Sequence, residues 1–192
     1  LFSGSTTHAC YYRSYIPEQT RRMMPFHEIQ SPGFWCGIHA LNNCVQSEEF
    51  TRQDAREAAD RVNLNLSDSI KKALKPSERT LVSSVGDLDV TVVEDILKHY
   101  GYKPEIVKDV KRALEIIDST DINGHCLIVN PDSHYVCYRL CYGVWWHHDS
   151  LAQAPVHTDK DELKAILHSL AKGSANSLGR RLIHFFNLLY PV

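Results

Sequence analysis

Apolar residues in the first third of the chain recur every three or four positions, the spacing of a helix with one buried side. The first such stretch begins at Cys36 and continues through Ile38, Leu41 and Val45. A second helix is predicted to start at Thr51-Arg52-Gln53-Asp54, which resembles a capping box with Asp in place of Glu. It should run to about residue 62.

Residues 47–80 together are predicted to form a polar helical hairpin. The second half of this hairpin is a shorter helical segment, Asp68–Leu74, which ends near Pro76. The many charged residues along the hairpin are typical of a solvated surface. A lid or a docking surface for a partner would have the same composition.

The rest of the chain is predicted to hold further helices and several short strands. The helices are Val90–Leu97, with Gly101 as a C-terminal stop, Lys108–Ser119 and Asp161–Ala171. The strands are Lys103–Val107, Cys126–Val129, His134–Leu140, Val144–Asp149 and Leu182–Tyr190. Because helices come first and mostly antiparallel strands follow, this order predicts an α+β fold rather than a βαβ fold.

Composition and charge narrow the possible partners. The 192 residues, 43% hydrophobic and 23% charged, are enough for one domain with its own core. The net charge of -2 indicates no basic surface for nucleic acid and no polybasic patch for a membrane. No apolar run approaches the roughly 18 residues that span a bilayer. We therefore expect neither nucleic acid nor a membrane as partner, and we expect a monomer.

The six cysteines are too sparse for a small scaffold held by disulfides, and no secretory signal peptide opens the chain. A reducing compartment, cytoplasmic or nuclear, is therefore expected. The chain starts at Leu1 without an initiator Met, which suggests a piece of a longer protein. Residues 1–24 show no sustained period and are predicted to be an N-terminal extension or arm. The folded domain is predicted to cover residues 25–192.

Cys36 is the leading candidate for a nucleophile. It follows the turn signal Ser31-Pro32-Gly33 and opens a helix, whose N-terminus carries about half a positive charge and free amide donors. Both features favour the thiolate, which is the reactive form of cysteine. Judged from its position alone, a buried structural cysteine is the commoner outcome.

A thiol nucleophile needs a base within hydrogen-bond reach and a third group that orients the base. His134 and Asp149 lie on two strands that are predicted to form a hairpin. A turn at Cys141-Tyr142 places His134 opposite Asp149, whereas a turn at Tyr142-Gly143 makes the two diagonal neighbours. Either turn puts both side chains on one face of the sheet, because side chains alternate with period two. A three-residue loop would separate them.

Other histidines compete for the role of base. His39 lies three residues after Cys36, a spacing at which helical side chains touch, but no acidic residue nearby in sequence would orient it. We therefore assign His39 to packing or to support of the site. His147 shares the predicted face of Asp149, whereas His148 alternates away from it, and His125 has no obvious partner.

Two residues near Cys36 are further candidates. Gln30, six residues earlier, could donate its side-chain amide to a developing oxyanion, a contribution of about 3 kcal/mol per donor, although it could equally be an exposed loop residue. Trp35 is a candidate substrate contact, with a core position as the alternative. The spacing of cysteines and histidines fits no common zinc pattern. We therefore expect no metal and no cofactor.

Three segments of the chain resemble Josephin domains. Phe26–Gln30 followed by Trp35–Asn43 is similar to the family's opening "FHEKQ…LCAQHCLNN". Further along, Ser133–Arg139 resembles "EHWFTVR" and Trp145–Ser150 resembles "WFNL(N/D)S". The resemblance covers residues 25–192. One departure is the interval from Gln30 to Cys36, which is one residue longer than in the family pattern.

The resemblance implies a papain-like cysteine protease fold, in which an N-terminal helical part with a helical hairpin packs on an antiparallel sheet. It also implies a deubiquitinase that acts on ubiquitin or polyubiquitin without a cofactor. By motif, Cys36 is the nucleophile, His134 the base, Asp149 the third member and Gln30 the oxyanion donor. The hairpin matches too poorly to carry over any ubiquitin contact.

Two other functions stay open at this point. The first is a papain-like protease for peptides, such as one that processes its own parent polyprotein. The second is a ubiquitin-binding module without activity. The complete set of Cys, His, Asp and Gln argues against the second, because an inactive relative is free to lose those residues.

Overall fold

The computed structural model describes residues 24–30, 33, 35–66, 81–83, 86–119, 124–130, 133–173 and 182–186. Its helices are α2 (Cys36–Val45), α3 (Arg52–Asn65), α5 (Val90–His99), α6 (Val110–Ser119) and α7 (Lys160–Gly173). Its strands are β1 (Glu105–Val107), β2 (His125–Val129), β3 (Val136–Cys141), β4 (Val144–His148), β5 (Val156–Thr158) and β6 (Leu182–Phe186). None of the described helices combines the length and apolar character that a membrane span requires.

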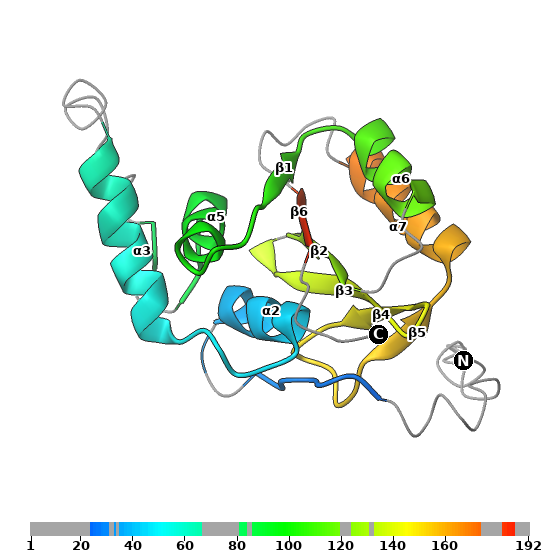
Figure 1. The fold of residues 1–192 in the computed structure, drawn as a ribbon, viewed down its shortest axis with the longest axis horizontal. Coiled ribbons are helices and arrows are strands. Elements are labelled where there is room, and N and C mark those ends of the chain that lie inside the picture. The colour runs from blue at the N-terminus through cyan, green and yellow to red at the C-terminus, as the bar shows by residue number, and fades with distance from the viewer. Residues whose placement is uncertain are drawn as a thin grey trace, which may run out of the picture.

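The described strands form one antiparallel sheet in the order β1-β6-β2-β3-β4-β5. Helix α2 packs on one face of this sheet, while α6 and α7 lie side by side on the other (Figure 1). Alternation along β3 divides the core, because Cys137 joins the cluster under α2 and Tyr138 joins the cluster under α6 and α7. Helices α3 and α5 pack against each other, and α3 extends away from the sheet (Figure 1).

The predicted helices are confirmed wherever the structure describes them. Helix α3 begins with the expected capping box, since the Thr51 hydroxyl accepts from the Asp54 amide at 3.3 Å and Asp54 Oδ2 accepts from the Thr51 amide at 2.7 Å. It ends at Asn65, three residues later than expected. Gly101 follows α5 with a φ of 85°, which confirms it as the residue that stops the helix.

The strands differ from the prediction at several ends, since β1 begins two residues later and β4 ends one residue earlier than expected, and two further differences bear on the site and the sheet. Strand β3 begins at Val136, so His134 lies just before the strand and does not open it. Strand β5 has no counterpart among the predicted strands, because three residues are too few for a pattern to stand out. The predicted segment Asp68–Leu74, the arm at 1–23 and the end of the last strand at 187–190 lie outside the described residues.

Helix α2 is buried along its whole length, so its polar side chains must find partners inside the protein. Asn42 accepts from the amides of Glu49 (3.1 Å) and Phe50 (2.8 Å) and donates to the Phe50 carbonyl (3.0 Å). Asn43 accepts from the Glu28 amide at 2.6 Å and donates to the Glu28 carbonyl at 3.3 Å. These two asparagines tie the segments on both sides of the helix to it.

The C-terminal end of α2 is bound by an arginine side chain from the sheet. Arg139 on β3 is 1% exposed, and its Nη1 donates to the carbonyl oxygen of Cys44 and to the sulfur of Cys126. Its Nε donates to the sulfur of Cys141 at 3.1 Å. A guanidinium beside the last carbonyls of a helix complements the negative end of the helix dipole. Arg139 thus anchors α2 to the sheet at the end opposite Cys36.

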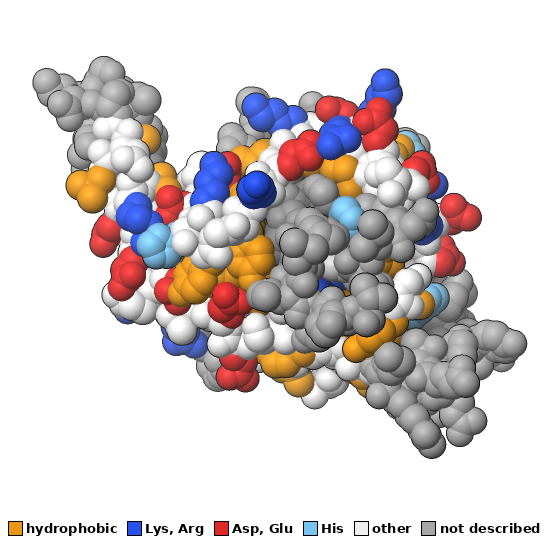
Figure 2. All heavy atoms as spheres, viewed as in Figure 1, with side chains coloured by type: hydrophobic (Ala, Val, Ile, Leu, Met, Phe, Trp, Pro, Cys, Tyr) orange, Lys and Arg blue, Asp and Glu red, His pale blue; other side chains and the backbone are white. Residues whose placement is uncertain are grey.

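The described surface mixes charges of both signs. On the face shown in Figure 2, acidic and basic side chains alternate over short distances. This pattern accords with the net charge of -2 for the whole chain.

Replacing Asn42 by Ala should strongly destabilise the fold. The change leaves the buried amide and carbonyl of Phe50 without partners, for a loss of about 2–4 kcal/mol in the free energy of unfolding. Urea denaturation measures this loss. The matched control is Asn65→Ala at an exposed position, where we expect a change within about 0.5 kcal/mol. Equal effects of the two changes would contradict the role given to Asn42.

Candidate active site

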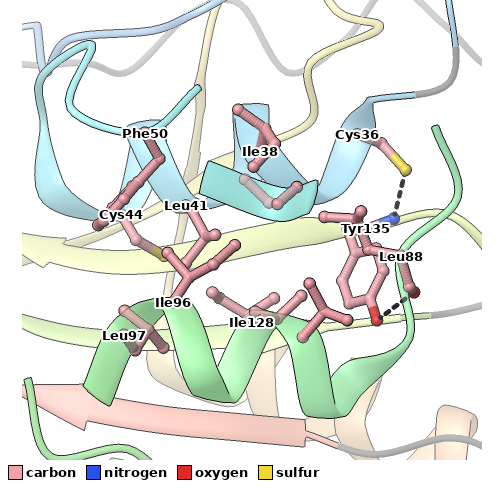
Figure 3. Close-up of a cluster of buried hydrophobic side chains, with 14 of the residues drawn as sticks. Cys36, Ile38, Leu41, Cys44, Phe50, Leu88, Ile96, Leu97, Ile128 and Tyr135 are labelled. Atoms are coloured by element: carbon pink, nitrogen blue, oxygen red, sulfur yellow. Dashed lines mark hydrogen bonds between the residues drawn. The ribbon is translucent and has the colours of Figure 1, made fainter. Parts of the chain in front are cut away.

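Cys36 is the first residue of α2, and it is 4% exposed. Its sulfur accepts a hydrogen bond from the backbone amide of Tyr135 at 3.4 Å, and the Tyr135 hydroxyl donates to the carbonyl of Leu88 at 3.0 Å (Figure 3). Three segments distant in sequence therefore meet around Cys36: the start of α2, the residues before β3 and the segment before α5.

The environment of Cys36 holds the thiol in its protonated form. Burial raises the pKa of Cys36 most strongly, and the charge of Asp87 raises it further. The amides of Tyr135, Gly37 and Cys36 itself lower the pKa, but the net pKa lies above its usual value. The helix N-terminus thus acts in the direction expected from the sequence, while burial outweighs it. A base is needed to form the thiolate.

His134 and Asp149 are in direct contact. His134 Nε2 lies 2.7 Å from Asp149 Oδ1, and both side chains are partly exposed, at 27% and 31%. The pairing of Cys141 with Val144 makes Tyr142-Gly143 the turn, with φ angles of 54° and 74°. Of the two turns considered from sequence, this is the one that makes His134 the diagonal neighbour of Asp149.

Asp149 is held as a carboxylate. Partial burial alone would raise the pKa of Asp149, but the Leu151 amide at 3.0 Å and the imidazole of His134 lower it, and the net pKa lies below its usual value. Because the carboxylate accepts from Nε2–H of His134, the other ring nitrogen, Nδ1, carries the lone pair. That nitrogen is the one able to accept a proton.

Gln30 lies next to the loop that carries Asp149. Its backbone amide donates to the Ser150 carbonyl at 2.7 Å, and its side-chain oxygen accepts from the Ser150 hydroxyl at 3.2 Å. One N–H of its side-chain amide points at the carbonyl of Gly33. The primary amide has a second N–H to offer. The assignment of Gln30 as an oxyanion donor stays a prediction.

Trp35 is 6% exposed and is held by groups from two other segments. The guanidinium carbons of Arg52 and Arg56 lie 5.3 and 5.8 Å from the centre of its ring. Gly86, with a φ of 103°, lies so close that a Cβ there would be 2.8 Å from the indole. Trp35 joins α3 to the start of α2, and its role as a substrate contact stays a prediction.

His39 has an acidic neighbour that the sequence did not reveal. Its Nδ1 lies 3.0 Å from Oε1 of Glu28, although the geometry is not that of a hydrogen bond. The two hydrogen bonds between the Asn43 side chain and the Glu28 backbone hold Glu28 in this position. The absence of an acidic partner therefore no longer argues against His39 as a base, although His39 faces the segment 24–30.

His147 and His148 point to opposite faces of β4, as expected. His147 stacks on Tyr138 with ring centres 4.7 Å apart, on the face of Asp149. His148 is fully buried on the other face, where its Nδ1 lies 3.3 Å from Nδ1 of His27. Because His27 Nε2–H donates to the Ala152 carbonyl at 3.0 Å, His27 Nδ1 is the acceptor and His148 the donor.

Sequence reasoning missed several residues that hold this site. Glu28, His27 and Ser150 lie inside the motifs but were given no role, and Asp87 was not singled out. The signal for Ser150 and Glu28 is their place in the family motifs. Asp87 had no signal. Among the described residues, no group of three His, Cys, Asp or Glu side chains is arranged to hold a metal ion.

His148 should make stability depend on pH. Burial lowers the pKa of His148 well below its usual value, so the folded protein keeps it neutral while the unfolded chain takes up a proton below about pH 6.5. The free energy of unfolding should therefore fall as the pH drops from 7 to 5, and His148→Gln should reduce this slope. Urea denaturation at each pH measures it. The same change at His168, an exposed residue of α7, is the control, and equal slopes in both variants would contradict the assignment.

Comparison with known proteins identifies the family of this chain. The family model of the Josephin domain matches residues 32–178, which is most of the chain. No curated protein gives a significant match. Among solved structures, the Pseudomonas avirulence protein AvrPphB is similar with a TM-score of 0.41 and 7% identity, over 79% of this chain and 89% of that chain. A likeness at that level carries no functional argument. By the family match, the chain belongs to the Josephin family and is a thiol-dependent hydrolase with the papain-like α+β fold.

Proposed function

We propose that this chain is a deubiquitinase that hydrolyses the amide bond at the C-terminus of ubiquitin, with Cys36 as nucleophile. Membership of the Josephin family, which is associated with binding and processing of ubiquitin, supports the substrate class. One observation carries the chemistry. The His134–Asp149 pair lies next in the chain to Tyr135, whose amide contacts the Cys36 sulfur.

His134 is proposed to be the base. Its Nε2–H is held by Asp149, so Nδ1 is left to accept the thiol proton of Cys36. The transfer gives a thiolate and an imidazolium, and the carboxylate of Asp149 stabilises the imidazolium. Such a transfer is needed because burial raises the pKa of the Cys36 thiol.

The reaction then follows acyl transfer. The thiolate attacks the carbonyl carbon of the terminal glycine, and a C–S bond forms while the oxygen takes the negative charge. Gln30 and the Cys36 amide are proposed to donate to that oxygen. The C–N bond breaks as the imidazolium gives its proton to the leaving amine. Water, deprotonated by His134, then attacks the thioester, which releases the carboxylic acid and restores the thiol.

A ubiquitin probe with a C-terminal electrophile should form a covalent adduct with the wild-type protein. Cys36→Ala should form none, because its side chain has no nucleophile. Mass spectrometry of the intact protein and of its peptides measures the adduct and its position. Unchanged thermal unfolding of Cys36→Ala is the control for folding.

Two results would contradict the proposed function. Cleavage of plain peptides without any ubiquitin adduct would favour a peptide protease. Tight ubiquitin binding without an adduct would favour an inactive binding module.

His134→Ala should lower kcat/KM for a ubiquitin amide by about 10²–10⁴-fold, the usual contribution of a general base. His39→Ala is the matched control and should lose far less, once both variants are compared at a temperature where each is folded. A fluorogenic ubiquitin substrate measures both. Full activity of His134→Ala together with loss of activity in His39→Ala would assign the base to His39 and its neighbour Glu28.

A further inference from the structure

The segment Gly86-Asp87-Leu88 runs across the start of α2 beside the nucleophile. Gly86 lies against Trp35, the residue before Cys36, so closely that a Cβ would be 2.8 Å from the indole. Leu88 lies against Gly37, the residue after Cys36, where a Cβ would meet Leu88 Cδ1 at 2.7 Å. The two neighbours of Asp87 thus pack on the two neighbours of Cys36, and Asp87 is left beside Cys36 itself.

The side chain of Asp87 points away from this contact and into solvent. Gly86 and Leu88 are buried, whereas Asp87 between them is exposed. The hydroxyl of Ser83 donates to Asp87 Oδ2 at 3.2 Å and accepts from the Asp87 amide at 2.9 Å. The carboxylate is therefore oriented by a neutral neighbour. Within the described part of the chain, no Lys, Arg or His lies within ion-pair distance of Asp87.

An oriented carboxylate that meets no cation among the described residues, at the rim of the proposed nucleophile, can be complemented by a cation from the substrate. We propose that Asp87 is a specificity-determining residue that pairs with a basic side chain in the acyl part of the substrate. The inference rests on the proposed function for its reaction class, since it assumes acyl transfer to Cys36. Arginine is the best match, because its guanidinium binds a carboxylate in a bidentate manner.

The pairing would also change the nucleophile. Burial is the main cause that raises the pKa of the Cys36 thiol, and the charge of Asp87 adds to it. A substrate cation on Asp87 offsets that charge and so favours the thiolate once the substrate is in place. Removal of the carboxylate should therefore have two opposite effects, with selectivity lost and the free thiol made more reactive.

Short peptide probes separate these effects. Tetrapeptides that end in a glycine vinyl methyl ester would carry one Arg, or its neutral analogue citrulline, at the second, third or fourth residue from the electrophile. Mass spectrometry gives the rate of adduct formation at Cys36. For at least one position, the wild-type protein should react ~3–10-fold faster with Arg than with citrulline. Asp87→Asn should lose this preference and react with the citrulline probes at least as fast as the wild type.

A second measurement uses no substrate. The pH at which Cys36 is half-maximally alkylated by iodoacetamide should be lower in Asp87→Asn than in the wild-type protein. Asp60→Asn is the matched control, because Asp60 is exposed on α3 and its change removes the same charge. Asp60→Asn should leave the preference for Arg and the alkylation profile unchanged.

The inference is overturned if the wild type reacts equally with Arg and citrulline probes, or with none of the peptides. It is also overturned if Asp87→Asn keeps the preference. An equal slowing of all probes in Asp87→Asn, with no change in alkylation, would reduce Asp87 to a structural role. Failure of the proposed function is a separate result, since it is the absence of an adduct with the ubiquitin probe.

Discussion

The complete burial of α2 constrains everything around it. A helix that water does not reach still has free amides at one end, free carbonyls at the other and polar side chains along its sides. Most of these groups are met by protein, and the partners come from all over the chain. The amides at the first end lie at the Cys36 sulfur, Arg139 donates to the carbonyl of Cys44 near the last turn, and Asn42 and Asn43 bind neighbouring backbone segments. Cys36, the proposed nucleophile, therefore lies at the N-terminal end of a helix that is bound to the protein at its C-terminal end and along its sides.

The same burial makes Cys36, the proposed nucleophile, dependent on its partners. A thiol taken out of water loses acidity, and the amides around Cys36 only partly offset that loss. The site therefore needs a base whose own orientation is secured. Asp149 holds one nitrogen of His134 and in turn receives the Leu151 amide.

The parts of the site are joined by the segment that precedes α2. This segment is bound to α2 through Asn43 and Gln46, and to the loop after β4 through His27 and Gln30. It thus connects the helix that carries Cys36 to the loop that carries Asp149. The buried His148, which is the residue before Asp149, also belongs to this junction because it donates a hydrogen bond to His27. Protonation of His148 would therefore disturb both the segment that carries His27 and the loop that carries Asp149.

The sequence by itself determined the local helices and strands, and it determined that His134 and Asp149 share one face of the hairpin. Helical spacing identified α2, α3, α5, α6 and α7, because their buried sides recur every three or four residues. The period of two in β3 and β4 placed His134 and Asp149 on one face before their distance was known. The motifs identified the family, since three segments in the right order are specific where each alone is weak.

Only the tertiary structure decided contacts between segments far apart in sequence. The Glu28 partner of His39, the burial that raises the pKa of Cys36 and the place of Asp87 beside Cys36 all depend on packing. None of them has a local signal, because a carboxylate in an exposed loop has the same sequence whether it faces water or a thiol. Periodicity indicates which side of a helix or strand is buried, but it does not indicate which residues pack against that side.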